Sequence, residues 1–252
     1  MTAVMTPATS LDCHAHVAPD VTSKQLESLG EVHVLAVTRT LKEAARVARR
    51  RDSKLTWGLG VHPGSSEAQS QYDPREFRYL LPRFALVGEI GLDRRGSRTR
   101  QHEILSDVLA ACADQPVLLS LHSTGRVREV LDVMATYPHP GFILHWFLAS
   151  AEEVAHAAAL GAYFSVNTAM SDEAISQMPR DRVLPETDFP AKSVRARVPG
   201  ATAALEDRLA TLWGTDAAGA RAELWRNMKA LATRSGAVER LSSSLTGVLM
   251  QV

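Results

Sequence analysis

The chain has 252 residues, 45% hydrophobic and 22% charged, and its 28 basic and 28 acidic side chains give a formal net charge of zero. This composition is typical of a globular protein and excludes a disordered tail or a coiled coil. Without net charge there is no global attraction to nucleic acids or acidic membranes, so a polyanion would have to bind a local patch. The length suits one large barrel, and we expect a single domain over residues 1–252.

Cysteine content and the first residues bear on the cellular compartment. Cys13 and Cys112 are too few for a disulfide framework, which favours a reduced, cytoplasmic protein. The opening MTAVMTPATS lacks the basic and apolar segments of a signal peptide. No apolar run approaches the roughly 20 residues of a membrane-spanning helix. We therefore expect a cytoplasmic location without membrane association.

Short runs rich in valine, isoleucine and leucine recur along the chain and alternate with longer segments of helical periodicity. Runs that are apolar on both faces are typical of strands that helices cover, as in parallel sheets. Eight strands are predicted, over residues 11–16, 32–37, 55–61, 85–92, 116–122, 141–147, 161–167 and 183–188.

The intervening segments carry the spacing of amphipathic helices. Helical patterns cover residues 41–48, 99–114, 127–134, 151–160, 205–213 and 220–232. In the first of them Leu41, Ala45 and Ala48 share one face, and Ser150 is a suitable N-cap for the fourth. Eight strand–helix units predict an α/β fold, a single (β/α)8 TIM barrel. A doubly wound open sheet is the alternative, but no glycine-rich phosphate loop follows the first strand.

Six side chains with metal-ligating chemistry lie at or near the ends of the predicted strands. Barrel active sites form at the carboxyl ends of the strands, so these side chains should meet. Each one alone has an ordinary structural explanation, such as a core histidine or a helix cap. Burying all six together without a metal would be costly, which favours a metal site. The six are His14, His16, Glu89, His122, His145 and Asp188.

The segments around these residues also form an ordered set of motifs. DCHAH, GVHP, GEIGLD, LHS, LHWF and ETDFP follow one another between residues 12 and 190, and RNMKAL occupies residues 226–231. Together they resemble the TatD family of metal-dependent hydrolases, for which GEIGLD followed by ETDxP is specific. The resemblance implies a TIM barrel of the metallo-dependent hydrolase type, a deoxyribonuclease that binds two divalent cations (Mg²⁺, Mn²⁺ or Zn²⁺).

The resemblance also implies roles for individual residues. His14, His16 and Asp188 would hold one ion, His122 and His145 would hold the second, and Glu89 would bridge the two. Asp188 would accept the proton of the attacking water, and Glu89 would keep the metals in register. His62 of GVHP would lie beside the site, as a phosphate contact or as a scaffold histidine. Asp93 would orient a ligand or form a turn.

The rim of the site departs from the family pattern. Thr124 stands where the family usually has arginine, Trp146 is bulky, and Leu148 and Ala149 replace a Ser-Gly pair. These changes affect substrate preference more than the metal centre. They suit a specialised branch such as the TatD-like nuclease of Qat-type anti-phage systems, where other subunits of a defence complex would be partners.

Basic side chains near the carboxyl ends of the strands are candidates for binding the phosphate backbone of a DNA substrate. Residues 49–51 are also basic but follow a helix, so we expect them at the opposite end of the barrel, where they complement the helix dipole. The predicted substrate-binding residues are Arg94, Arg95, Arg98, Arg126, Lys192 and Arg195.

Two other functions compete with a deoxyribonuclease. An amidohydrolase-like enzyme for small esters or amides would keep the metals but enclose an apolar pocket. A non-catalytic binding subunit would have no need for Asp188. An arginine-rich rim favours phosphates over small molecules, and the intact set of six ligands argues against a subunit that only binds.

Overall fold

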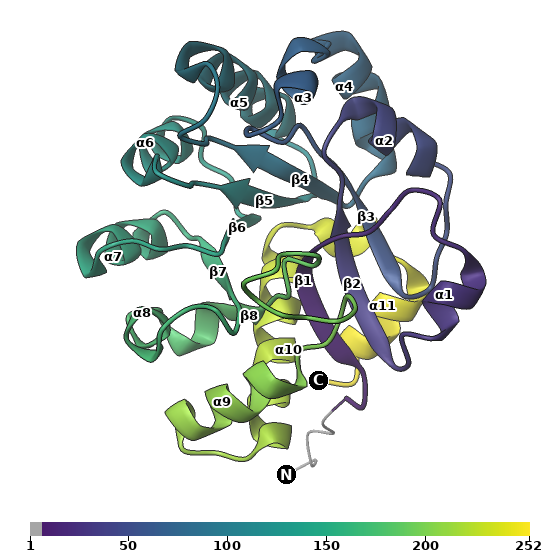
Figure 1. Cartoon of the computed structure of the whole chain (residues 1–252), viewed down its shortest axis with the longest axis vertical. Coiled ribbons are helices and arrows are strands. Elements are labelled where there is room, and N and C mark those ends of the chain that lie inside the picture. Colours follow the sequence, from purple (N-terminus) through teal and green to yellow (C-terminus); the bar gives the residue numbers. More distant parts are fainter. Residues whose placement is uncertain (1–6) are drawn as a thin grey trace.

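A computed structural model, which describes residues 7–252, shows eight parallel strands in the sequential order β1 to β8, with helices around them (Figure 1). This order confirms the predicted barrel and excludes the doubly wound sheet, because the strand order of a doubly wound sheet reverses at a switch point. The strands are β1 Ser10–His16, β2 Val32–Val37, β3 Leu55–Leu59, β4 Leu86–Gly91, β5 Leu118–His122, β6 Phe142–His145, β7 Tyr163–Val166 and β8 Val183–Pro185.

Helices follow most strands and form the outer layer. None of those in the described part of the chain combines the length and the apolar composition that crossing a bilayer requires. The expectation about a signal peptide concerns residues 1–10 and lies largely outside the described residues. The α-helices are α1 Ser23–Glu27, α2 Leu41–Val47, α3 Ser66–Ser70, α4 Pro74–Leu80, α5 Arg98–Cys112, α6 Val127–Thr136, α7 Ala151–Ala159, α8 Asp172–Ser176, α9 Ala203–Trp213, α10 Ala217–Arg234 and α11 Ser243–Leu249, and the 3₁₀ helices are η1 Leu81–Arg83, η2 Arg180–Arg182 and η3 Ala237–Glu239.

Local predictions for two helices have different outcomes. Ser150 caps α7 as expected, and its hydroxyl accepts the backbone N–H of the third helical residue. In α2 the predicted Leu41 is buried, and so is Ala48 just after the helix, but Ala45 is exposed and Ala44 and Val47 complete the buried face. The prediction was wrong at Ala45 because spacings of three and four residues are both helical, and alanine marks neither side.

The C-terminal helices close the amino end of the barrel. Side chains of α10 join those of β1, β2 and β4–β8 in one buried cluster. Because these strands come from different sides of the barrel, their side chains can meet only in its interior. The indole N–H of Trp225 donates to the carbonyl of Thr9 (2.8 Å), and the amide of Asn227 donates to the carbonyl of Val183 (2.8 Å). Both carbonyls lie where β1 and β8 begin, so α10 seals that end (Figure 1).

Two strands change register inside the barrel. The β1–β2 ladder shifts between residues 12 and 15, and the β4–β5 ladder shifts between residues 87 and 90. Such bulges break the strict alternation of side chains and re-aim those that follow. His14 and Glu89 lie within these two shifts, so the bulges set the direction in which both side chains point.

Backbone hydrogen bonds close the barrel between β8 and β1. The N–H of Asp188 donates to the carbonyl of His14 (2.9 Å), and the N–H of His16 donates to the carbonyl of Phe189 (2.8 Å). Both bonds lie beyond the last residue of β8. The seam therefore places Asp188 directly beside the two histidines that end β1.

A buried carboxylate supports the same seam. Asp12, fully buried on β1, accepts hydrogen bonds from the backbone N–H of Thr187 (2.9 Å), the hydroxyl of Thr187 (2.6 Å) and the backbone N–H of Gly200 (2.7 Å). Burial raises the pKa of Asp12 to about 6 despite these three donors. Asp12 thus ties β1 to the segment that carries Asp188.

Replacing Asp12 with alanine should weaken the closure of the barrel. Asp12→Ala leaves four donors without acceptors, the three above and the backbone N–H of His14 (3.2 Å), and a net loss of about 1 kcal/mol for each predicts roughly 4 kcal/mol less free energy of unfolding. Urea denaturation followed by circular dichroism measures it. The control is Asp132→Ala on the exposed surface of α6, which should change the midpoint little. Equal midpoints for both variants would contradict the role of Asp12.

Candidate metal centre

The carboxyl ends of the strands bring together all six side chains that the sequence predicts as metal ligands. His14 and His16 come from β1, Glu89 from β4, and the others from the ends of β5, β6 and the segment after β8. Most of these side chains are buried, and Asp188 keeps 15% of its side chain exposed. A cluster of this kind at one end of a barrel can hold a divalent ion.

Glu89 lies at the middle of the cluster. Its Oε2 is 3.1 Å from His16 Nε2 and 3.7 Å from His14 Nε2. Its Oε1 is 2.6 Å from His122 Nδ1 and 3.3 Å from His145 Nε2. Each oxygen therefore faces a different group of histidines, which is the arrangement expected of a carboxylate between two ions.

Asp188 completes the side of the cluster near β1. Its Oδ1 lies 3.8 Å from His14 Nε2 and 3.7 Å from His16 Nε2. The backbone of Asp188 is left-handed, with φ of 43°, a conformation that typically costs about 1–3 kcal/mol and occurs at functional sites. The seam with β1 holds this conformation and aims the carboxylate at the histidines.

His62 lies beside the cluster, as the sequence predicts. Its Nε2 is 3.3 Å from Glu89 Oε2, and its ring is 5.5 Å from the ring of His122. Its Nδ1 accepts the backbone N–H of Gly64 (2.9 Å). The geometry fits both a ligand and a residue that contacts substrate, because one nitrogen faces the centre while a turn fixes the other.

Four buried atoms in the cluster have no hydrogen-bond partner: His14 Nε2, His16 Nδ1, Glu89 Oε2 and His145 Nδ1. Two of them, His14 Nε2 and Glu89 Oε2, face the same space. A buried polar atom without a partner costs about 1–3 kcal/mol, and a cation between these atoms would remove that cost. Imidazole and carboxylate groups are also ligands that Zn²⁺ and Mn²⁺ accept. The residues present therefore fit a divalent metal.

Neighbouring side chains fix two of the histidine rings. Ser120 Oγ lies 2.8 Å from His14 Nδ1, and Asp93 Oδ2 lies 2.8 Å from His122 Nε2. Asp93 in turn accepts two hydrogen bonds from the guanidinium of Arg95 (2.8 and 2.9 Å). Contacts of this kind set the orientation of metal-binding imidazoles. Asp93 therefore orients His122, one of the two roles expected for it.

Sequence reasoning missed Glu186, which lies behind His145. Its Oε2 is 3.4 Å from His145 Nδ1, and it accepts hydrogen bonds from the hydroxyl of Ser165 and from the amide of Asn167 (2.8 Å). The signal was its position two residues before Asp188. The missed Ser120 had a signal too, as a polar residue inside an apolar strand.

Burial and mutual charge set the ionisation of the cluster. Burial opposes a charge on Glu89, yet hydrogen bonds from the surrounding imidazoles hold its pKa well below the ordinary value. Burial lowers the pKa of His14 to about 3 and that of His62 to about 4. Burial, with Glu186 and Glu89 nearby, raises the pKa of Asp188 to about 6. At neutral pH Glu89 is thus ionised while these two histidines are neutral, as ligands must be.

An open pocket of about 380 Å³ leads to the cluster. Trp146 and Leu148 line one part of its mouth, and Thr124 and Arg95 line another. Trp146 has left-handed backbone (φ 41°), and Leu148 is 57% exposed. Three of the four residues that depart from the family pattern, Thr124, Trp146 and Leu148, therefore line this pocket.

Three of the arginines predicted to bind substrate already have carboxylate partners. Arg95 binds Asp93, Arg98 lies 2.7 Å from Glu129, and Arg126 lies 3.1 Å from the same glutamate. Arg94, Lys192 and Arg195 are exposed and have no ion pair within residues 7–252. The latter three keep their full charge for a ligand.

Comparisons with known proteins agree with this geometry. A family model described as TatD-related DNase matches residues 11–233. The 3'-5' ssDNA/RNA exonuclease TatD of Klebsiella pneumoniae is 28% identical over 177 residues, which are 63% of this chain and 67% of that protein.

Solved structures show the same fold. A TatD homologue of Escherichia coli K12 superposes with a TM-score of 0.73 at 21% identity, covering 87% of this chain and 97% of that one. An uncharacterized amidohydrolase of Saccharomyces cerevisiae gives 0.69 at 16% identity, covering 89% and 100%. Because the family model spans most of the chain, the protein belongs to the TatD-related DNase family.

Proposed function

We propose that this protein is a metal-dependent deoxyribonuclease that hydrolyses phosphodiester bonds in DNA. The observation that supports it most is Glu89, whose two oxygens face different groups of histidines. Membership of the TatD-related DNase family and the similarity to a curated exonuclease for single-stranded DNA and RNA support the same class of substrate.

Two divalent cations, Mg²⁺, Mn²⁺ or Zn²⁺, are the proposed cofactors. His14, His16 and Asp188 would hold one ion and His122 and His145 the other, with Glu89 shared between them. Bound there, the ions would supply Lewis-acid stabilisation of the charge that develops on the phosphoryl oxygens. The predominance of imidazole favours Mn²⁺ or Zn²⁺ over Mg²⁺.

Asp188 is the proposed acceptor of the proton that the attacking water loses. Its carboxylate is the more exposed of the two in the cluster and lines the pocket, where a water can reach it. Glu89 is buried and surrounded by imidazoles, so its role is to hold the ligands in place. His62, beside the pocket, would contact the scissile phosphate.

The pocket mouth supports a nucleic-acid substrate. Arg94, Lys192 and Arg195 would bind phosphates, with Arg95, Arg98 and Arg126 contributing less because each is already paired with a carboxylate. The Trp146 ring offers an apolar surface on which an unstacked base can lie. A cytoplasmic location and a place beside other subunits of an anti-phage defence complex stay predictions.

Glu89→Gln should abolish binding of divalent metal. The amide keeps the shape of the side chain but loses the negative charge and one acceptor, so we expect at least a hundredfold weaker affinity for Mn²⁺ by titration calorimetry. The matched control is Glu129→Gln, because Glu129 is a partly buried glutamate that pairs with a basic side chain, and this variant should bind Mn²⁺ normally. Normal Mn²⁺ binding by Glu89→Gln would contradict the proposed centre.

Asp188→Asn should lower kcat strongly while the protein still folds. The amide retains one ligand oxygen and the shape but cannot accept the proton, and loss of a general base typically costs about 10²- to 10⁴-fold in kcat. Labelled single-stranded DNA with saturating Mn²⁺ measures kcat, and metal analysis of the same sample shows whether the ions are present. If the metallated variant turns over at a nearly normal rate, the base lies elsewhere, and His62→Gln is the next variant.

Neutralising Arg94 and Lys192 should weaken DNA binding in a salt-dependent way. Each lost phosphate contact flattens the slope of log affinity against log salt by about 0.7 on single strands. The control pair is Arg46→Ala and Arg75→Ala, exposed on the outer helices α2 and α4. Equal loss of DNA affinity in both pairs would show a general charge effect and would contradict phosphate binding by Arg94 and Lys192. No loss in either would favour the small-ester or small-amide substrate, or a subunit without a nucleic-acid substrate.

A further inference from the structure

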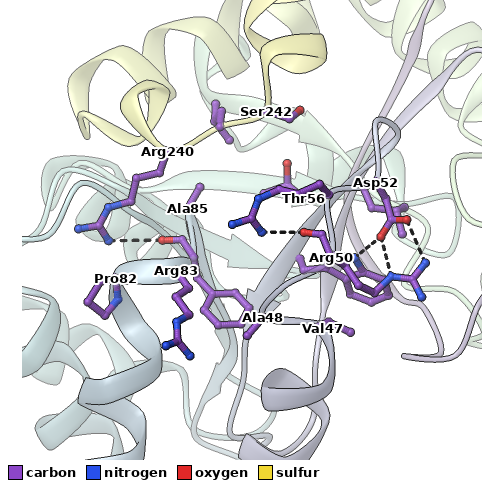
Figure 2. Close-up of a pocket in the computed structure, with 15 residues that line it drawn as sticks. Val47, Ala48, Arg50, Asp52, Thr56, Pro82, Arg83, Ala85, Arg240 and Ser242 are labelled. Carbon is purple, nitrogen blue, oxygen red and sulfur yellow. Dashed lines mark hydrogen bonds and ion pairs between the residues drawn. The ribbon is translucent and has the colours of Figure 1, made fainter.

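A second pocket of about 380 Å³ lies at the opposite end of the barrel from the metal centre (Figure 2). Its walls come from the turn between α2 and β3, from η1 and the start of β4, and from the segment after α10. These segments are far apart in the sequence and meet at the amino ends of β3 and β4. The pocket is therefore separate from the site proposed for catalysis.

Four arginines and one carboxylate line this pocket. The carboxylate, Asp52, is bound by the Nε and Nη2 of Arg50 (2.7 and 2.9 Å) and by the indole N–H of Trp57 (2.7 Å), as Figure 2 shows for the Arg50–Asp52 pair. The guanidinium of Arg50 also lies over the Trp57 ring and donates to the carbonyls of Pro19 and Val21. Arg50 lies at the end of the barrel opposite the metal centre, as expected, and these contacts fix it in the wall of the pocket.

The other three arginines have no carboxylate partner within residues 7–252. Arg51 donates to the carbonyl of Arg50 (2.8 Å). Arg83 donates to the hydroxyl of Tyr79 (3.0 Å). Arg240 donates to the Oε1 of Gln115 (2.7 Å) and to the carbonyls of Leu81 and Phe84. A guanidinium has five donors, so each of the three keeps N–H groups that these neutral acceptors do not use.

The local charge is thus strongly positive in a chain whose total formal charge is zero. Four guanidiniums and one carboxylate leave three positive charges around one pocket. The hydrogen bond from Arg83, together with the charges of Arg83 and nearby Arg49, lowers the pKa of Tyr79, which is the response of a phenol to a positive field. Guanidiniums gathered without counter-charges are typical of sites for phosphate groups, which they bind in a bidentate manner.

We propose that this pocket binds a small phosphate-bearing ligand. Its volume falls in the range of small-molecule sites, and Phe84 and Leu241 add apolar walls beside the arginines. The phosphate would contact Arg51, Arg83 and Arg240, the three arginines that have no carboxylate. Inorganic phosphate groups and the phosphate of a nucleoside monophosphate share this chemistry, and both are probes below.

The test uses the full-length chain with Glu89→Gln, in which the metal centre can no longer recruit phosphate through ions. Titration calorimetry with pyrophosphate and with deoxyadenosine monophosphate should show one site. Adding Arg51→Glu and Arg83→Glu should weaken Kd by about tenfold or more for each change, since each removes a charge-assisted contact. These two side chains are exposed and make no contact that folding needs, unlike Arg50.

The matched control is Arg46→Glu with Arg75→Glu, which carries the same charge change away from the pocket and should leave Kd within about twofold. If deoxyadenosine monophosphate binds more tightly than pyrophosphate, and deoxyadenosine does not bind, the pocket is a nucleotide site. If pyrophosphate binds more tightly than the monophosphate, the pocket is a site for inorganic phosphates. The proposal is overturned if neither probe binds, if the control weakens binding equally, or if citrate binds as tightly as pyrophosphate. None of these outcomes depends on nuclease activity.

Discussion

The seam between β8 and β1 is the constraint on which the metal centre depends. The other neighbouring strands pair through parallel ladders, whereas this junction is held beyond the end of β8 by two backbone hydrogen bonds and the buried carboxylate of Asp12. Asp188, His14 and His16 all lie at this junction. If the seam opened, Asp188 would move away from both histidines, so the closure of the barrel and the assembly of the site are one event.

The centre also carries an energetic cost that a cation would offset. His14 Nε2 and Glu89 Oε2 are buried without partners, and the left-handed backbone of Asp188 is strained. A ligand that binds only the folded state stabilises that state by mass action. Metal binding would therefore stabilise the strand ends by giving partners to polar atoms that packing alone leaves unsatisfied. The folding of the strand ends is in this way linked to the presence of the ion.

Much of this could be predicted from the sequence, because periodicity and spacing are local properties. Eight apolar runs gave the strands, and the chemistry at their ends gave the ligand candidates that the barrel brings together. The predicted strand over residues 183–188 is shorter in the structure and ends at Pro185. The N–H of Glu186 still donates to Val166 of β7, but the residues that follow bond with β1. The bulges around His14 and Glu89 were not predictable, since a register shift depends on the partner strand and leaves no mark in composition.

Charge is where sequence reasoning was least informative. Basic residues near the catalytic end were expected to be available to substrate, yet Arg98 and Arg126 share Glu129, which His102 also contacts. Basic residues at the amino end were expected to have only a local role, yet with others from distant segments they surround a pocket with an excess of positive charge. A count of charges along the chain cannot separate these cases, because the field at a site depends on which carboxylates the fold places beside each guanidinium. A net charge of zero is therefore compatible with one arginine cluster that is paired with carboxylates and another that has an excess of positive charge on the same barrel.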